Sequence, residues 1–374
     1  MLLQILRYLT LPLAIPYGLI VALRNKLYDW KLSDSLQFNL PIINVGNLSV
    51  GGTGKTPHTE YLIELLQDTY QVATLSRGYG RYTRGFILAA EGINARDIGD
   101  EPMQFFTKFP HISVCVCEDR ILAVPQLKQR KPYTQVLLLD DAFQHRSIAP
   151  SLNILLTDFS KPYTKDYILP FGNLREFRSG AIRADIIVVT KCPHELTEAQ
   201  AAVITKEINA TEHQQVFFST LAHGEAYSAN TGEKTSLKGK QILLVSGIAN
   251  NAALVAYLKQ EADMVHVLKY KDHYYYNTDD VQDILETFGN MPKGNNILLC
   301  TEKDFTRLAL HQNLFTQANI ALHVLPVKIS FLFNAASQFE RLILQHILLY
   351  YPILEQHEYN YGQTKQYQDQ EGKD

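Results

Sequence analysis

The chain has 374 residues, a formal net charge of −3, 46% hydrophobic residues and 20% charged residues. This composition is typical of a globular protein with enough apolar residues for two cores. The small net charge argues against nucleic acid as a partner, because nucleic-acid-binding proteins usually need a strongly basic face. The four cysteines are too few and too scattered for a disulfide framework, which indicates a reducing, cytoplasmic setting.

Residues 1–30 are predicted to form an apolar segment that associates with a membrane. The stretch 8–23 carries no charge and is flanked by Arg7, Arg24 and Lys26. It is shorter than the ~20 residues of a membrane-spanning helix and is interrupted by prolines, and no signal-peptide cleavage site follows it. A helix lying on a membrane surface and a helix packed in the core both remain open, and the basic flanks favour the surface.

Residues 31–215 alternate apolar, strand-like runs with helical patterns. Near-continuous Val, Ile and Leu runs separated by helices predict a parallel sheet covered on both faces, which is an α/β fold. The predicted strands are 40–45, 71–75, 86–89, 112–117, 136–139, 153–156 and 186–189. Cys115 and Cys117 fall in one of them, where a buried strand explains them better than a metal pair does. The predicted helices are 56–66, 101–109 and 120–127.

Residues 216–330 are predicted to form a second, smaller α/β domain. Its expected strands are 241–245, 264–268 and 296–299, and the polar stretch 226–240 is expected to be a surface loop. Residues 331–355 contain an amphipathic helical pattern that is expected to pack back on the first domain. The polar tail 356–374 has the composition of a disordered segment.

The most specific motif is the segment 49–56, Ser-Val-Gly-Gly-Thr-Gly-Lys-Thr, which follows a predicted strand and begins a predicted helix. This is the context of a P-loop, in which backbone N–H groups hold phosphates, the lysine reaches the β- and γ-phosphates and the threonine binds Mg²⁺. A serine stands where the first glycine is usual. The predicted nucleotide-binding residues are Ser49, Val50, Gly51, Gly52, Thr53, Gly54, Lys55 and Thr56.

Two further strand ends support a nucleotide site. Asp140 and Asp141 end a hydrophobic strand, as in a Walker-B element, so we expect them to support Mg²⁺ together with Thr56. The segment 190–193, Thr-Lys-Cys-Pro, ends another strand, at the place where GTPases carry a guanine-reading motif. The acidic residue of that motif is replaced by Pro193, which favours adenine over guanine as the base of the bound nucleotide.

Other polar residues have both a structural and a functional interpretation. The loop 76–84 carries three arginines and is either an anion-binding loop or a solvated turn. Asp100 starts a helix, where it can act as a cap or as a general base. His273 follows a strand beside Asp272 and is either an imidazole of the active site or a structural histidine.

Together these segments resemble one family, the tetraacyldisaccharide 4'-kinases, which act in the lipid A pathway of Gram-negative bacteria. Besides the loop in Gly-Asn-Leu-Ser-Val-Gly-Gly-Thr-Gly-Lys-Thr-Pro at 46–57, the chain carries Ser-Arg-Gly-Tyr-Gly-Arg at 76–81 and Gly-Asp-Glu-Pro at 99–102. The remaining matches are 140–146, 169–176, 272–274 and 301–304. Ala142 and Phe177 depart from the family pattern, away from the proposed proton transfer.

The resemblance implies a kinase that uses ATP and Mg²⁺ to phosphorylate the 4'-hydroxyl of a tetraacylated glucosamine disaccharide 1-phosphate, forming a bisphosphorylated lipid A precursor. It implies work at the cytoplasmic face of the inner membrane, and the sequence identifies no protein partner. By similarity, Lys55 and Asp100 are catalytic, with Asp100 as general base and His273 of the second domain orienting it. Residues implied to line the phosphate and substrate region are Arg77, Arg120, Gln144 and Arg175.

A different class of protein shares the central motifs. A nucleotide-switch protein or a metallochaperone NTPase, with no lipid substrate, would also need the P-loop and the strand-end aspartates. Such a protein has no use for the apolar N-terminal segment, so this segment favours the lipid kinase.

Overall fold

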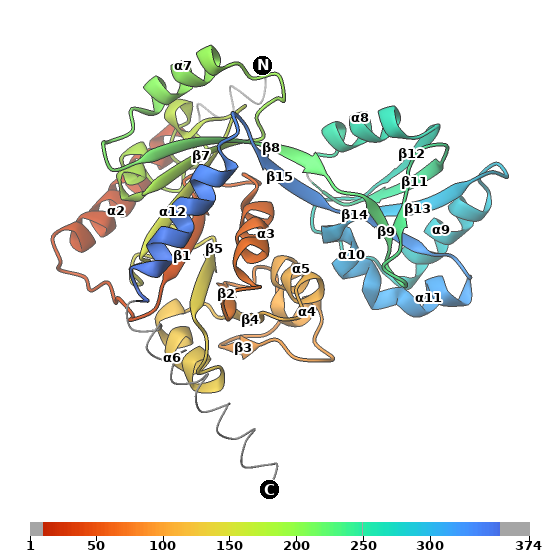
Figure 1. Cartoon of the computed structure of the whole chain (residues 1–374), viewed down its shortest axis with the longest axis horizontal. Helices are drawn as coiled ribbons and strands as arrows, with labels where there is room; N and C mark the ends of the chain where they lie inside the picture. Colours follow the sequence, from red (N-terminus) through yellow and green to blue (C-terminus); the bar gives the residue numbers. More distant parts are fainter. Residues whose placement is uncertain (1–9, 249, 352–374) are drawn as a thin grey trace, which may run out of the picture. The chain divides into compact units, whose positions relative to one another are not determined.

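The computed structural model describes residues 10–248 and 250–351, and the chain divides into two compact units. Unit 1 comprises Met1–Leu75, Arg120–Thr220 and Ser330–Asp374, and unit 2 comprises Ser76–Asp119 and Leu221–Ile329. Residues 76–119, which the sequence analysis expected in the first domain, therefore cluster with the second unit. The strands and helices of both units can be followed by label in Figure 1.

Unit 1 is built on a parallel sheet. Its elements are α2 (Leu11–Asp29), β1 (Ile42–Asn47), α3 (Lys55–Leu66), β2 (Val72–Ser76), α6 (Arg120–Arg130), β5 (Val136–Asp140), β6 (Leu152–Asp158), η1 (Tyr163–Lys165), η2 (Arg178–Arg183), β7 (Ile186–Thr190), α7 (Glu198–Ile208), β8 (Gln215–His223), β15 (Val327–Phe331) and α12 (Ala336–Leu348). The strands run β8-β7-β6-β1-β5-β2, all parallel to their neighbours. The carboxyl ends of β1, β5, β6 and β7 therefore share one edge, which is where α/β sheets bind ligands.

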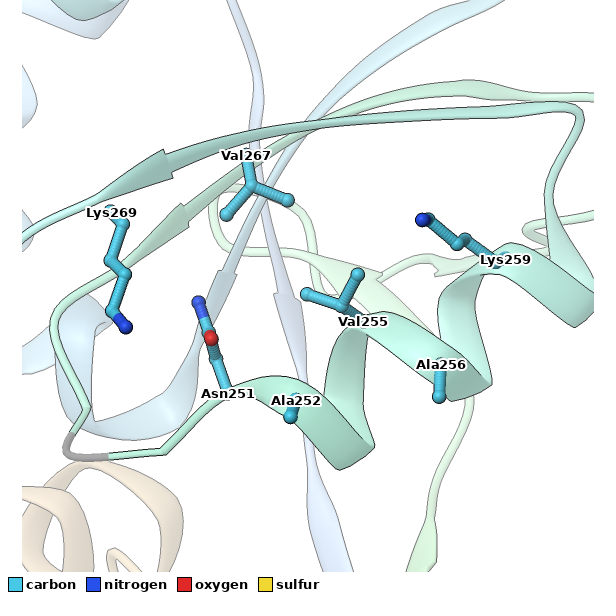
Figure 2. Close-up of a pocket in the computed structure, with 7 residues that line it drawn as sticks. All are labelled: Asn251, Ala252, Val255, Ala256, Lys259, Val267 and Lys269. Carbon is cyan, nitrogen blue, oxygen red and sulfur yellow. The ribbon is translucent and has the colours of Figure 1, made fainter. Parts of the chain in front are cut away.

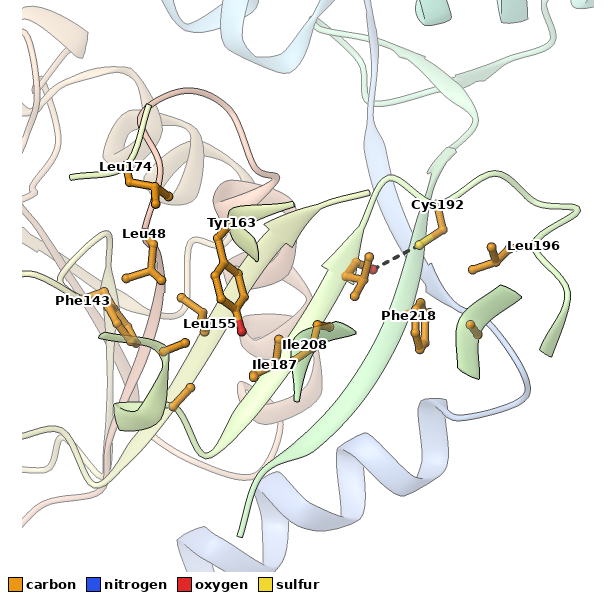
Figure 3. Close-up of a cluster of buried hydrophobic side chains, with 14 residues drawn as sticks. Leu48, Phe143, Leu155, Tyr163, Leu174, Ile187, Cys192, Leu196, Ile208 and Phe218 are labelled. Carbon is orange, nitrogen blue, oxygen red and sulfur yellow. Dashed lines mark hydrogen bonds between the residues drawn. The ribbon is translucent and has the colours of Figure 1, made fainter. Parts of the chain in front are cut away.

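Helices cover both faces of this sheet, as the strand composition predicts. One face packs in a cluster that joins β6, β7 and β8 to α7 and includes Leu155, Ile187 and Phe218 (Figure 3). Phe217 faces the other way, because neighbouring strand residues alternate, and its ring lies 5.5 Å from that of Phe339 on α12. The amphipathic C-terminal helix thus packs within unit 1, and the predicted tail 356–374 lies outside the described residues.

Helix α2 packs on unit 1 through one narrow face and leaves its apolar side chains exposed. Ala14 and Gly18 are buried, whereas Leu13, Ile15, Leu19, Ile20 and Leu23 are between 58% and 68% exposed. These five side chains are not part of the core of unit 1. In the described part of the chain, no helix is both long and apolar enough to cross a membrane.

Unit 2 is a second α/β sandwich. Its elements are β3 (Ile87–Leu88), α4 (Ala95–Ile98), α5 (Asp100–Lys108), β4 (Ser113–Val116), β9 (Ala226–Ser228), β10 (Lys234–Thr235), β11 (Gln241–Ser246), α8 (Ala252–Glu261), β12 (Met264–Lys269), α9 (Thr278–Gly289), β13 (Asn296–Thr301), α10 (Glu302–Leu308), η3 (Ala309–His311), α11 (Gln312–Gln317) and β14 (Leu322–Leu325). The main sheet has the order β10-β9-β14-β13-β11-β12. Alternate residues of β11 and β13 pack against α8 on one face and against α9, α10 and α11 on the other (Figure 1).

One sequence prediction for this unit is wrong. The stretch 226–240, expected as a loop, contains the antiparallel pair β9 and β10, and β9 extends the main sheet by pairing with β14. Strands of two or three residues are too short to leave an alternating pattern.

Ion pairs between α5 and α10 explain why residues 76–119 belong to unit 2. Glu101 Oε1 lies 2.7 Å from Lys303 Nζ, and Lys108 Nζ lies 2.8 Å from Glu302 Oε1. The partners come from distant parts of the sequence, so their pairing leaves no local signal.

Candidate active site

The glycine-rich loop joins β1 to α3 in unit 1. Gly51 and Gly54 have φ angles of 102° and 86°, a region that residues with a Cβ rarely adopt. A Cβ built on Gly51 or Gly52 would meet no atom within 4 Å, so this stretch is open to a ligand. The loop therefore provides an exposed run of backbone N–H groups directly before a helix N-terminus, which attracts anions.

Lys55, the first residue of α3, lies beside the end of β5. Its Nζ is 3.3 Å from Asn47 Oδ1 and 3.6 Å from Asp141 Oδ2. Arg175 binds the same carboxylate with two hydrogen bonds of 2.8 and 3.0 Å. Burial raises the pKa of Asp141, but Lys55, Arg175 and Arg120 outweigh it, so that the pKa lies below its ordinary value. Asp141 is thus ionised at neutral pH. Its backbone has a left-handed φ of 54°.

Gln144 connects Arg175 to a residue that the sequence analysis did not single out. Gln144 Nε2 donates to Asn47 O at 2.9 Å and to Glu176 Oε1 at 3.0 Å, and its Oε1 accepts from Arg175 at 3.2 Å. Glu176 is only 1% exposed and also accepts a 2.7 Å hydrogen bond from Arg183. The only sequence feature that could have pointed to Glu176 is its position directly after Arg175.

The remaining residues expected to bind Mg²⁺ lie at the same edge of the sheet. Thr56 is buried in the first turn of α3, and Asp140, also buried, ends β5 next to β1, where its register partner is Val45. Arg120 is buried at the start of α6. Within the described ranges, no three His, Cys, Asp or Glu side chains gather as a metal site.

The second group of predicted residues lies inside unit 2. Asp100 Oδ2 is 2.9 Å from His273 Nδ1, although the two residues are 173 positions apart in the chain. The sequence predicts that Asp100 and His273 lie in different domains, whereas both residues belong to one unit. His273 has a left-handed φ of 55°, and its side chain is 36% exposed.

Arg307, which the sequence analysis missed, is the third member of this group. It is fully buried on α10, and its Nε and Nη2 donate to Asp100 Oδ2 at 3.0 and 2.7 Å. Its Nη1 also lies 3.7 Å from Asp304 Oδ1. Two donors therefore meet at one oxygen of Asp100, whereas Asp100 Oδ1 is buried and has no hydrogen-bond partner among the described residues.

These contacts set the charges of the group. Burial raises the pKa of Asp100, but the hydrogen bonds from His273 and Arg307 outweigh burial, and the net pKa is below its ordinary value. The hydrogen bond to Asp100 raises the pKa of His273 above its ordinary value. The group is thus a buried carboxylate held ionised, with one oxygen that has no hydrogen-bond partner among the described residues.

Unit 2 has two further features, an arginine-bearing loop beside His273 and a separate groove. Arg77 is exposed, and in the same loop the Tyr79 ring lies 6.0 Å from the His273 ring. A shallow groove of about 520 Å³ lies between α8 and β12, where Lys259 and Lys269 flank apolar side chains such as Val255 and Val267 (Figure 2). None of the predicted site residues lines this groove.

A parallel sheet whose first strand leads through a glycine-rich loop into a helix, with a lysine on that helix and an aspartate ending the neighbouring strand, defines the P-loop NTPase class of fold. The comparisons with known proteins give the family. The model of the family described as tetraacyldisaccharide-1-P 4'-kinase (LpxK) matches residues 6–348.

Related proteins agree with this match. The tetraacyldisaccharide 4'-kinase of Bacteroides thetaiotaomicron is 43% identical over 352 residues, covering 91% of this chain and 92% of the relative. That of Flavobacterium johnsoniae is 44% identical over 348 residues, covering 92% and 98%. The solved structure of LpxK from Aquifex aeolicus in complex with ATP has a TM-score of 0.71 at 29% identity and covers 91% of this chain and 99% of that one.

This chain therefore belongs to the tetraacyldisaccharide 4'-kinase family. The family resemblance, the fold class and the assignment to phosphotransferases that act on a hydroxyl group are confirmed. The alternative of a nucleotide switch or metallochaperone finds no support in these comparisons.

Proposed function

We propose that this chain transfers the γ-phosphate of ATP to the 4'-hydroxyl of a tetraacylated glucosamine disaccharide 1-phosphate and so forms a bisphosphorylated lipid A precursor. The observation that carries the proposal is the open glycine-rich loop that ends in Lys55, in a chain that matches this kinase family over most of its length. The ATP complex of the Aquifex aeolicus relative supports ATP as the donor.

The residues at the edge of the unit 1 sheet suit a magnesium–triphosphate complex. The Thr56 hydroxyl and the Asp140 and Asp141 carboxylates offer the hard oxygen ligands that Mg²⁺ prefers, and Mg²⁺ usually takes one or two carboxylates together with substrate phosphates. When bound, the ion neutralises charge on the phosphate oxygens. Lys55 and the loop amides supply the same stabilisation from the protein, and Asn47 and Asp141 hold the lysine.

Asp100 is proposed as the general base. It is ionised at neutral pH, and its Oδ1 lacks a partner within the described structure, so this oxygen can accept the proton of a sugar hydroxyl. A carboxylate of lowered pKa is a weak base, which suits a loose transition state in which little proton transfer is needed early. His273 orients the carboxylate through the other oxygen.

Arg77, Arg120, Gln144 and Arg175 remain proposed contacts of the phosphate and substrate region. Arg175 and Gln144 are the best supported, because they bind each other and Arg175 binds Asp141. A guanidinium suits a phosphate, but Arg175 already makes two hydrogen bonds to Asp141. Its first role would therefore be to hold the Asp141 carboxylate in place.

The protein is proposed to work peripherally on the cytoplasmic face of the inner membrane. The exposed apolar side chains of α2 and the basic Arg24 and Lys26 are the combination found in helices that lie in a membrane interface. The acyl chains of the proposed acceptor would place it at the same surface.

A direct assay tests the function. Labelled ATP and the purified disaccharide 1-phosphate should give a labelled bisphosphorylated lipid with the wild-type protein, and no such product would refute the proposal. Asp100→Asn is expected to lower kcat by about 10²–10⁴-fold, the usual loss for a general base.

Two further variants complete this assay. Lys55→Met should abolish turnover, and His273→Ala should lower it. Lys165→Met is the matched control, because Lys165 forms an exposed pair with Glu207 and is none of the proposed site residues. Near-normal turnover in both Asp100→Asn and His273→Ala would remove the dyad from the mechanism.

A further inference from the structure

The Thr-Lys-Cys-Pro segment at the end of β7, which suggested a base-reading motif, contacts the glycine-rich loop instead. Thr190 Oγ1 donates to Thr53 O at 2.8 Å, and Lys191 Nζ donates to Gly52 O. The next carbonyl, Gly54 O, lies 2.7 Å from Nδ1 of His58. Three consecutive loop carbonyls are therefore each bound by a different side chain.

The direction of the loop amides follows from these contacts. In a planar trans peptide, the C=O of one residue and the N–H of the next point in opposite directions. Fixing the carbonyls of Gly52, Thr53 and Gly54 turns the N–H groups of Thr53, Gly54 and Lys55 away from the three side chains. These are amides at the end of the loop and the start of α3, where phosphate is expected to bind.

We propose that Thr190, Lys191 and His58 form a carbonyl clamp that holds the phosphate-binding loop in its ligand-ready conformation before the nucleotide arrives. The three are positioning residues for ATP and need not touch it. This inference rests on the proposed use of the loop for ATP. Its benefit is preorganisation, because a loop ordered in advance loses less conformational entropy on binding.

Two of the three side chains of the carbonyl clamp, Lys191 and His58, are themselves held by a second contact. Lys191 Nζ is 2.8 Å from Asp158 Oδ2. His58 Nε2 is 3.0 Å from Ser219 Oγ. Burial lowers the pKa of His58 to about 4, so the ring is neutral at pH 7 and carries a single N–H. Since a carbonyl only accepts, this N–H is on Nδ1, and the Ser219 hydroxyl donates to Nε2.

The backbone that carries Thr190 and Lys191 is fixed by the core. Cys192, the next residue, is buried in the cluster with Phe218 and Leu196, and its Sγ donates to Val189 O at 3.3 Å (Figure 3). Its N–H donates to Ser219 O at 2.9 Å. Lys191 has a left-handed φ of 56°, which is unusual for a residue with a Cβ. The contacts of Thr190 before it and of Cys192 after it hold the turn in this conformation.

Nucleotide affinity in variants of the clamp tests this inference. Lys191→Met and Thr190→Val each remove one donor, and Lys191→Arg keeps one. The dissociation constant of adenylyl imidodiphosphate with Mg²⁺, measured by calorimetry, is expected to rise about tenfold for each of the first two variants, the usual loss for one hydrogen bond. Lys191→Arg should stay close to wild type. KM for ATP should rise in parallel, whereas KM for the lipid acceptor should not change.

The outcomes are distinguishable from one another and from failure of the proposed function. Lys191 is partly exposed, and valine has the shape of threonine, so both variants should fold, which the melting temperature verifies. Lys165→Met should bind the analogue normally. Wild-type affinity in both Lys191→Met and Thr190→Val would refute the clamp, as would equal losses in Lys191→Met and Lys191→Arg. A wild-type protein that binds the analogue but forms no lipid product would instead refute the proposed function.

Discussion

At the scale of single residues, the buried arginine beside Asp100 helps to set the charge of that carboxylate. Arg307 directs two N–H groups to Oδ2, whereas the buried Oδ1 has no hydrogen-bond partner among the described residues. Burial raises the pKa of Asp100, and the hydrogen bonds from His273 and Arg307 together lower it below its ordinary value, so loss of the arginine removes part of what keeps the carboxylate ionised. Arg307 therefore helps to keep Asp100 ionised and occupies only one of its two oxygens.

Replacing Arg307 should change the pH dependence of turnover. Arg307 favours the ionised form of Asp100, so its loss raises the pKa of the carboxyl group. The acidic limb of the kcat/KM profile for the lipid acceptor should shift to higher pH in Arg307→Met. Arg307→Lys keeps the charge and should shift the limb less. An acidic limb that stays in place in Arg307→Met would show that Asp100 is not the titrating group.

The same pKa shift predicts how stability depends on pH. The folded-state pKa of Asp100 lies below its unfolded value of about 3.9, so its ionised form stabilises the protein above that value. This contribution is lost as the pH falls through the folded pKa. Urea unfolding followed downward from pH 6 should show less acid destabilisation in Asp100→Asn than in wild type, because asparagine does not titrate. Equal slopes would contradict this sign.

At the scale of elements, buried strands were easy to predict and contacts between distant segments were not. The runs that became β5 and β7 are buried on both faces, so they consist of Val, Ile and Leu up to a polar last residue. The loop 49–56 was recognisable because its glycines and lysine are adjacent in sequence. Arg307 was not, because its partner Asp100 is 207 positions away and nothing local marks an arginine as buried.

Helix α12 should contribute strongly to the stability of unit 1. Phe339 is 2% exposed, and its ring lies 4.4 Å from that of Phe331 and 6.0 Å from that of Tyr61. Phe339→Ala is expected to lower the free energy of unfolding by about 3–5 kcal/mol. Leu348→Ala in the same helix is the control, because Leu348 is 56% exposed. Urea unfolding that gave equal losses for both variants would contradict the packing described here.

At the scale of the whole molecule, helix α2 links an exposed apolar surface to proposed site residues of unit 1. Tyr17 Oη donates to Arg175 O at 3.0 Å, and Asn25 Nδ2 donates to Glu176 Oε2 at 2.7 Å. Both contacted residues belong to the network around Gln144 and Asp141. A helix that lay in a membrane interface would therefore hold this network close to the lipid headgroups.

Membrane attachment through α2 can be tested with vesicles. Leu19 and Ile20 are 63% and 68% exposed, and burying each fully in an apolar phase would contribute roughly 1.5–3 kcal/mol. The double variant Leu19→Ser, Ile20→Ser should therefore lose at least tenfold in binding to vesicles of phosphatidylethanolamine and phosphatidylglycerol, measured by flotation. Leu348→Ser, Leu349→Ser removes two exposed apolar side chains elsewhere and is the control.

The kinetics of the same double variant separate attachment from catalysis. Its KM for the lipid acceptor in vesicles should rise, because the enzyme no longer concentrates at the surface that holds its substrate. With a short-chain acceptor dissolved in detergent, its kcat should match that of wild type, since the side chains of Leu19 and Ile20 are mostly exposed and are not part of the core of unit 1. Vesicle binding equal to wild type would show that α2 is not the anchor. A kcat that fell in detergent as well would show that the two residues support the fold of the site.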